Sequence, residues 1–66
     1  MRVVVNNEET VCEAGTSVLM LIRRLGLNPE RVVVELNTAI LPAAAFADTV
    51  RAEGDRLELL QFVGGG

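Results

Sequence analysis

The residues of this chain that could take part in chemistry are few, and the most unusual of them are at its end. The 66-residue sequence closes on Phe-Val-Gly-Gly-Gly, with three consecutive glycines at positions 64–66. Glycine loses more conformational freedom on folding than any other residue and has no side chain to pack. A strand or helix therefore gains nothing from this segment, and the group it presents for chemistry is the terminal carboxylate of Gly66.

The remaining side chains are poorly suited to catalysis. The sequence has no His, Lys, Tyr or Trp, and its six cations are all arginines, which stay protonated and cannot act as bases. General acid–base catalysis usually relies on His, Lys or a carboxylate tuned by a cleft, and a domain this small has little room for a cleft. We therefore expect a protein that is not an enzyme and that binds no cofactor or metal of its own.

Two other groups of residues could be given a chemical role. Cys12 could relay sulfur, but its place at the inward end of a predicted strand favours a small buried hydrophobic residue. Glu8, Glu9 and Glu13 could bind a metal, but no further ligands converge on them, which favours a solvated hairpin face. A single cysteine excludes an internal disulfide, and the absence of a secretory segment then indicates the cytoplasm.

Length and charge limit the kinds of partner. A chain of this size is one domain with a small core, and half of its residues are hydrophobic. Its net charge of −3 argues against nucleic acid, which requires a basic patch. No apolar run approaches the length of a membrane span, so we expect neither nucleic acid nor membrane as a partner.

The first half of the chain predicts a hairpin followed by a helix. Residues 1–5 and 9–13 read as strands, and Asn6 and Asn7 between them tolerate the positive φ of a tight turn. Ser17 or Thr16 is a suitable N-cap, and Gly26 is placed to end the helix. The apolar stripe of this helix is Val18, Leu21, Ile22 and Leu25.

The second half predicts further strands. Residues 31–37 form a clear strand, 40–42 a short extended piece, 43–48 one helical turn, 53–55 a turn and 56–62 the last strand. With the first and last strands parallel in the middle, this order predicts an α+β roll: a mixed four- to five-stranded sheet with one main helix on one face. Residues 1–62 form the domain and 63–66 a flexible tail. The expected core is Met1, Val3, Val5, Val18, Leu21, Ile22, Leu25, Val34, Leu36, Leu57 and Leu59, with Cys12 beside it.

The last strand also predicts a docking surface. If Leu57 and Leu59 face the helix, strand alternation turns Leu60 and Phe62 to the opposite face. Val4 and Val33, on the neighbouring strands, join them there. A contiguous apolar patch beside a reactive tail is typical of a partner-binding site, which we expect to include Val63. Homodimerisation through this face, or an ordinary sheet surface, are the alternatives.

The sequence resembles a known protein family. The segments VELN (34–37), ILP (40–42) and EGDRLELLQF (53–62), with the terminal GGG, are similar to the sulfur carrier proteins of thiamine biosynthesis, the ThiS family of the ubiquitin-like β-grasp superfamily. The resemblance covers the whole chain without insertions. Its most specific element is Gly-Asp-x-Leu-Glu (54–58) combined with a glycine pair at the C-terminus.

The resemblance implies a carrier cycle. An E1-like adenylyltransferase with MgATP adenylates the Gly66 carboxylate, and sulfur from a cysteine-derived persulfide converts it to a thiocarboxylate. A thiazole synthase then receives the sulfur. Gly64 and Gly65 suit a tail that threads narrow channels, because any Cβ would obstruct the passage. The carrier is expected to be monomeric without its partners.

Other carriers of this kind remain open as alternatives. The chain could be the small sulfur-carrying subunit for molybdopterin, a carrier for another sulfur metabolite, or a ubiquitin-like modifier that forms isopeptide bonds. The helix also departs from the family pattern, because Leu19, Met20, Arg23 and Arg24 stand where such carriers usually have acids. This departure does not affect the chemistry of the tail, but it leaves the partner less determined.

Overall fold

Two hairpins, a helix, a 3₁₀ turn and a final strand make up the described part of the chain. The computed structural model describes residues 1–50 and 52–61, and the predictions for Phe62, Val63 and the three terminal glycines lie outside the described residues. The elements are β1 (Arg2–Val5), β2 (Glu8–Val11), α1 (Val18–Arg24), β3 (Val32–Leu36), β4 (Ala39–Leu41), the 3₁₀ turn η1 (Ala43–Ala45) and β5 (Arg56–Gln61).

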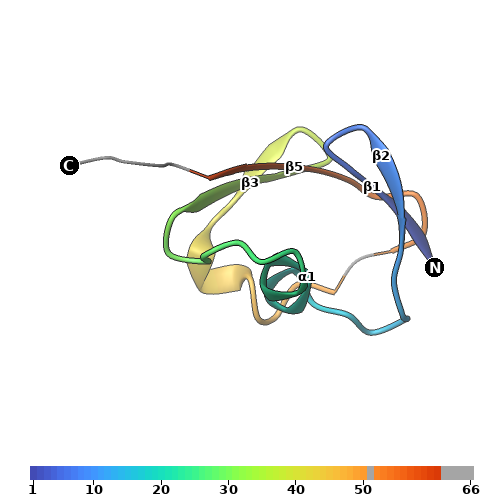
Figure 1. Ribbon diagram of the computed structural model, residues 1–66, viewed down its shortest axis with the longest axis horizontal. Helices are drawn as coiled ribbons and strands as arrows, with labels where there is room; N and C mark the ends of the chain where they lie inside the picture. The colour runs from blue at the N-terminus through green and yellow to red at the C-terminus, as the bar shows by residue number, and fades with distance from the viewer. Residues whose placement is uncertain (51, 62–66) are drawn as a thin grey trace.

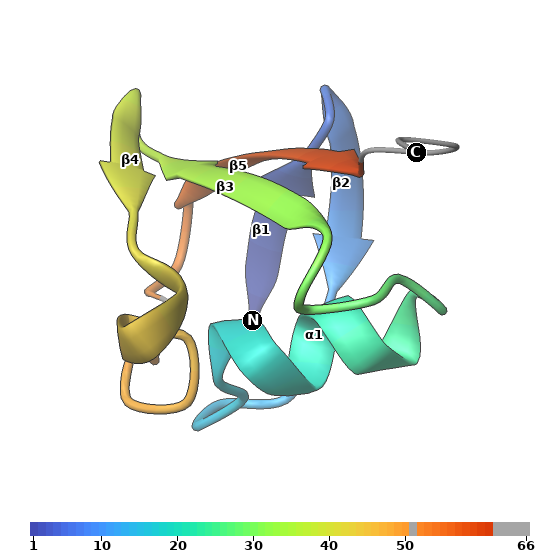
Figure 2. The ribbon, with the colours of Figure 1, turned by 90° about the vertical axis from the view of Figure 1, so that its left-hand side faces the viewer.

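The strands form one mixed sheet in the order β2-β1-β5-β3-β4. β1 and β5 are parallel, with Val4 opposite Arg56, and the other neighbours are antiparallel. Helix α1 lies across one face of the sheet and leaves the other face uncovered (Figures 1 and 2). The predicted α+β roll is confirmed, with five strands and with its first and last strands parallel at the centre.

Both hairpins turn through left-handed backbone. Asn6 and Asn7 have φ of 48° and 69°, as the sequence predicted, and Asn37 and Thr38 have φ of 50° and 73°. Positive φ at both central residues is typical of the type I′ turn, whose twist matches that of the paired strands. The second turn was not predicted, because a β-branched residue such as Thr38 seldom adopts positive φ.

Helix α1 has well-defined ends. The hydroxyl of Ser17 accepts a hydrogen bond from the Met20 N–H at 3.1 Å, which confirms the predicted N-cap. At the other end the N–H of Gly26 donates to the Arg23 carbonyl and that of Leu27 to the Ile22 carbonyl, both at 3.0 Å. With φ of 78° at Gly26, these bonds form a Schellman motif.

The core lies between α1 and the inner face of the sheet, and most of it was predicted. One assignment was wrong: Leu25 is 44% exposed. Leu25 is the C-cap, so the chain leaves the helix there, and Leu27 packs against the core instead. Met1 and Leu36 are only half-buried. The buried hydrophobic residues are Val3, Val5, Cys12, Val18, Leu21, Ile22, Val32, Val34, Phe46, Leu57 and Leu59.

Phe46 was not expected in the core. It follows η1, and its carbonyl accepts a hydrogen bond from the Leu19 N–H at 3.0 Å, which fixes the segment against the start of α1. The Thr49 carbonyl accepts from the Val18 N–H at 2.9 Å in the same way. Helix α1 has seven residues, and no helix in the described part of the chain is long and apolar enough to cross a membrane.

Candidate functional site

The candidate site is the end of β5, from which residues 62–66 continue. β5 lies between β1 and β3 at the centre of the sheet. Its side chains alternate as predicted: Leu57 and Leu59 are buried under α1, whereas Glu58 and Leu60 are exposed on the outer face. The strand therefore leads from the middle of the sheet into residues 62–66, and the apolar side chain of Leu60 lies on the outer face near its end.

Two of the predicted docking residues lie side by side. Val33 of β3 and Leu60 of β5 are register partners, so their side chains share the outer face. Val33 is half-buried, and Leu60 is 63% exposed. We call these two residues the Val33–Leu60 pair.

Val4 is on the same face but does not join this pair. Its register partner on β5 is Arg56, so Arg56 and the outward-facing Glu58 stand between Val4 and Leu60. The expectation of one contiguous apolar patch was wrong for this residue. The reason is the parallel register of β1 and β5, which places Val4 beside the beginning of β5 and not beside its end.

Next to the Val33–Leu60 pair lies a pair of like charges. Glu35 and Glu58 are opposite each other on β3 and β5, and both are exposed. Like charges placed directly opposite on a sheet destabilise it. The Val33–Leu60 pair is therefore bordered by negative charge. The approach of a cation from another molecule would relieve the repulsion between the two acids. The sequence does not predict this feature, because only the register shows that the two acids meet.

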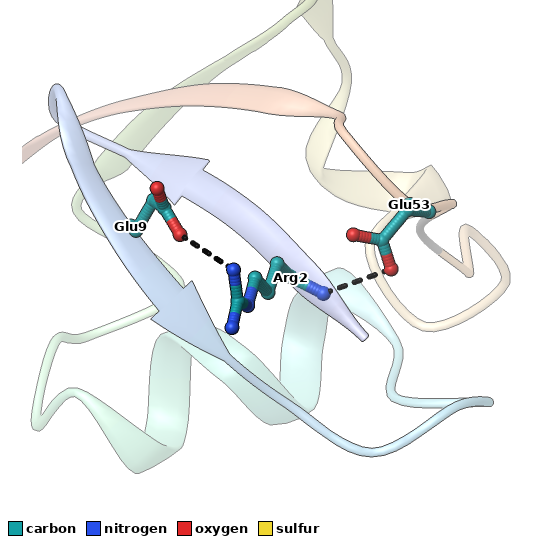
Figure 3. Close-up of polar contacts among 3 residues, drawn as sticks. All are labelled: Arg2, Glu9 and Glu53. Atoms are coloured by element: carbon teal, nitrogen blue, oxygen red, sulfur yellow. Dashed lines mark hydrogen bonds and ion pairs between the residues drawn. The ribbon is translucent and has the colours of Figure 1, made fainter.

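The beginning of β1 carries a different set of charges (Figure 3). The guanidinium Nη1 of Arg2 is 3.7 Å from Oε1 of Glu9 on β2, and the backbone N–H of Arg2 donates to Oε1 of Glu53 at 3.1 Å. Both members of the ion pair are exposed, so it adds at most about 1 kcal/mol of stability. Here each acid has a positive or donating partner, whereas Glu35 and Glu58 have none among residues 1–50 and 52–61.

A shallow open hollow of about 280 Å³ lies beside Arg2. Ligand-binding pockets usually measure roughly 300–1,000 Å³ and enclose most of the ligand. This hollow is smaller and open, so it is poorly suited to hold a substrate. Its lining consists of Arg2, Val3, Val4, Glu9, Glu53 and Gly54.

Two asparagine side chains hold β5 from opposite edges. Oδ1 of Asn6 accepts the Leu59 N–H at 2.7 Å, and Nδ2 of Asn6 donates to the Leu59 carbonyl at 3.2 Å. On the other edge, Oδ1 of Asn37 accepts the Arg56 N–H at 2.9 Å, and its Nδ2 donates to Oδ1 of Asp55 at 3.0 Å. We call these the Asn6 clamp and the Asn37 clamp. The sequence predicted Asn6 only as a turn residue.

A further contact fixes the last described residue of β5. The side-chain Oε1 of Gln61 accepts a hydrogen bond from the Asn28 N–H at 2.7 Å. Asn28 lies in the loop between α1 and β3, so this bond joins the end of β5 to the helical layer.

The other candidate residues have no site around them. Cys12 is buried in the core, as predicted for a small hydrophobic residue. Glu8, Glu9 and Glu13 are exposed. Within residues 1–50 and 52–61, no three His, Cys, Asp or Glu side chains come together in a way that could hold a metal ion.

Comparison with known proteins gives a consistent result. The family model described as "ThiS family" matches residues 1–66. The crystal structure of the thiamine biosynthesis protein ThiS from Geobacter metallireducens is 36% identical, with a TM-score of 0.79 and full coverage of both chains. Its solution structure gives 35% identity and a TM-score of 0.78, covering 100% of this chain and 88% of that one.

Sequence relatives include much longer proteins. A thiazole synthase from Paramagnetospirillum magneticum is 38% identical over all 66 residues, but this chain spans only 20% of its length. A thiazole synthase from Magnetococcus marinus gives the same figures. The ycf40 protein of Pyropia yezoensis, which is uncharacterized, is 40% identical over 94% of this chain and 87% of its own.

Proposed function

This chain belongs to the ThiS family, and we propose that it is a sulfur carrier protein of thiamine biosynthesis. The observation that carries the proposal is the full-length likeness, in sequence and fold, to a thiamine biosynthesis protein. The terminal Phe-Val-Gly-Gly-Gly supports it, because it supplies a carboxylate on unbranched backbone. The proposal requires that Gly66 be the last residue of the mature protein.

The proposed chemistry takes place at the Gly66 carboxylate. A carboxylate oxygen attacks the α-phosphorus of MgATP on an E1-like adenylyltransferase, releasing pyrophosphate and forming an acyl adenylate. The terminal sulfur of a cysteine persulfide then attacks the acyl carbon and AMP leaves. A thiol reductant cleaves the resulting S–S bond, becoming disulfide-bonded to the donor cysteine, and the thiocarboxylate remains on Gly66.

The residue types indicate which groups the carrier supplies to the reaction and which groups its partner enzymes must supply. The sequence has no His or Lys to move protons, so the catalytic groups must come from the partner enzymes. The carrier supplies a reacting group that different active sites can reach. Gly64 and Gly65 present no side chain to a narrow channel. We propose that the carrier acts as a co-substrate of its partner enzymes in the cytoplasm and that it needs no cofactor of its own.

The outer face of the sheet is the proposed docking surface. The Val33–Leu60 pair provides its apolar centre, and we propose that Phe62 and Val63, which lie outside the described residues, also take part in docking. Glu35 and Glu58 at its border favour partners with a basic rim. Val4 is a separate contact further along the same face.

A thiazole synthase is the proposed acceptor of the sulfur. The support is that two relatives named thiazole synthase contain a segment similar to this whole chain. In those proteins a carrier-like segment occupies about a fifth of the polypeptide. We propose that the same association between carrier and thiazole synthase occurs here.

Reconstitution tests the proposal. The purified chain, MgATP, the adenylyltransferase of the same host and a persulfide donor should yield a protein whose intact mass shows one oxygen replaced by sulfur. Addition of thiazole synthase and its substrates should return the mass to the carboxylate form. Return of the mass only with a molybdopterin-forming partner, or covalent adducts with other proteins, would refute the thiazole assignment. The same spectrum shows whether Gly66 is the terminal residue.

A further inference from the structure

β5 extends further than the strand beside it. β1 ends at Val5, which pairs with Leu57, and the chain then turns at Asn6 and Asn7. Leu59 therefore meets a side chain where a strand would continue. A carboxamide has one carbonyl acceptor and an N–H donor, as a peptide group does. The Asn6 clamp thus replaces one residue of a strand along the β1 edge of β5.

The end of β5 is held on three sides. Along its β3 edge, Leu60 pairs with Val33 and Gln61 with Val32. On its inner face, the side chain of Gln61 accepts the Asn28 N–H. Along its β1 edge the contact is the Asn6 clamp, whose shorter bond measures 2.7 Å. Removing this clamp leaves the edge without the two bonds to Leu59.

We propose that Asn6 is a positioning residue for the reaction at Gly66. Gly66 is five positions after Gln61, so the place and direction in which β5 ends set where the carboxylate can reach. With the clamp in place, this end is ordered before a partner binds. Without the clamp, the end of β5 must become ordered during the reaction, which raises the activation free energy. Small misplacements of a reacting group are costly to the rate. This inference rests on the proposed sulfur-carrier function.

The Asn37 clamp is a matched control within the same molecule. Asn37, like Asn6, is the first of the two central residues of a type I′ turn, and its φ is 50° compared with 48° for Asn6. It also bonds to the backbone of β5 through its side-chain oxygen, but at Arg56, where the strand begins. A purely structural role predicts similar effects of the two asparagines. A positioning role predicts an effect on the reaction from Asn6 alone.

The experiment compares Asn6→Gly with Asn37→Gly. Glycine tolerates the positive φ of each turn, and the substitution removes the carboxamide together with its Cβ from both positions alike. Pyrophosphate exchange by the adenylyltransferase is measured with each carrier as the varied substrate, well below its melting temperature. We expect kcat to fall roughly five- to 150-fold for Asn6→Gly, the factor for the loss of two net hydrogen bonds, with little change in KM. Asn37→Gly should keep the wild-type kcat.

A loss of stability alone gives a different result. Partial unfolding lowers the concentration of active carrier, which raises the apparent KM and leaves kcat unchanged. Hydrogen exchange of the Leu59 amide provides a readout independent of any enzyme, and it should quicken in Asn6→Gly and not in Asn37→Gly. If Asn6→Gly does not fold, Asn6→Asp and Asn37→Asp are compared by kcat and KM alone, because an aspartate oxygen can still accept the backbone N–H of β5 and only the donor of each carboxamide is lost.

Three outcomes overturn the inference. Equal kcat for the two glycine variants, with an active wild-type carrier, refutes the role of Asn6 and leaves the sulfur-carrier function intact. Unchanged exchange of the Leu59 amide in Asn6→Gly refutes the clamp itself. A wild-type chain that supports no pyrophosphate exchange refutes the proposed function, and this inference with it.

Discussion

Two adjacent leucines of β5 should respond to mutation in opposite ways. Leu59 is 8% exposed and faces α1, whereas Leu60 is 63% exposed on the outer face. We therefore predict that Leu59→Ala impairs folding and leaves no well-defined binding to measure, and that Leu60→Ala preserves the fold and weakens partner binding. The two changes remove the same atoms, so any difference comes from the environment alone.

The magnitudes follow from burial. A Leu→Ala change in a core costs roughly 2–5 kcal/mol, and a chain of this length is stable by roughly 3–10 kcal/mol, so Leu59→Ala removes much of the stability. Leu60 is largely exposed in the free protein, and its truncation should change stability by about 0.5 kcal/mol or less. Burying a whole leucine is worth ~1.5–3 kcal/mol. The exposed part of Leu60 then contributes about 1–2 kcal/mol on docking, a roughly five- to thirtyfold change in Kd.

The assays are urea unfolding of each variant and titration calorimetry with the adenylyltransferase and with thiazole synthase. Met20→Ala is the control, since Met20 is 58% exposed on α1, on the opposite side of the sheet from Leu60. It should change neither property. Equal destabilisation by Leu59→Ala and Leu60→Ala would show that β5 does not face as described. Wild-type affinity of Leu60→Ala for both partners would remove the Val33–Leu60 pair from docking.

Three further predictions concern the reacting end and the core. Deletion of Gly66 should abolish adenylation and leave the thermal melt unchanged; a deleted protein that still supports pyrophosphate exchange would contradict the carrier cycle. Phe62→Ala should weaken binding to at least one partner by about 2 kcal/mol or more, roughly 30-fold, and calorimetry beside a melt of the variant would show whether binding or folding is affected. Cys12 is buried, so its thiol should react slowly with a thiol reagent in the native state and quickly in urea; fast native labelling would mean that the core is open there.

Features set by neighbouring residues in the sequence were predictable. The Asn6-Asn7 turn and the Gly26 terminus depend on positive φ, which few residue types adopt, and the Ser17 cap depends on a hydroxyl that accepts the Met20 N–H. The alternation of β5 was also predictable, because Leu57 and Leu59 define one face of a strand. These local signals were sufficient to give the order of elements and the roll.

Features that depend on register were not predictable. Nothing in the sequence places Val4 opposite Arg56 or Glu35 opposite Glu58, because one shift of a strand would change both pairs. The Asn6 clamp is also non-local, because Asn6 and Leu59 are 53 positions apart in the sequence.

The burial of Leu25 and of Phe46 was also assigned wrongly, because it depends on contacts that the sequence pattern does not show. Leu25 continued the helical period, but the period does not show that α1 ends at Arg24. Phe46 lies among alanines with no periodic pattern, so its burial depends on how the segment returns to α1.

The position of β5 in the sheet has a consequence for how the protein is made. β5 is the last strand in the described part of the sequence and the central one in space, between the β2-β1 and β3-β4 hairpins. Two-stranded hairpins are marginally stable in water on their own. A nascent chain that lacks β5 has only these two hairpins and a short helix, and long-range pairing of this kind is slow to form. The central strand is therefore added only after residues 56–61 have emerged from the ribosome, so every completely folded molecule contains the strand that leads to the reactive end.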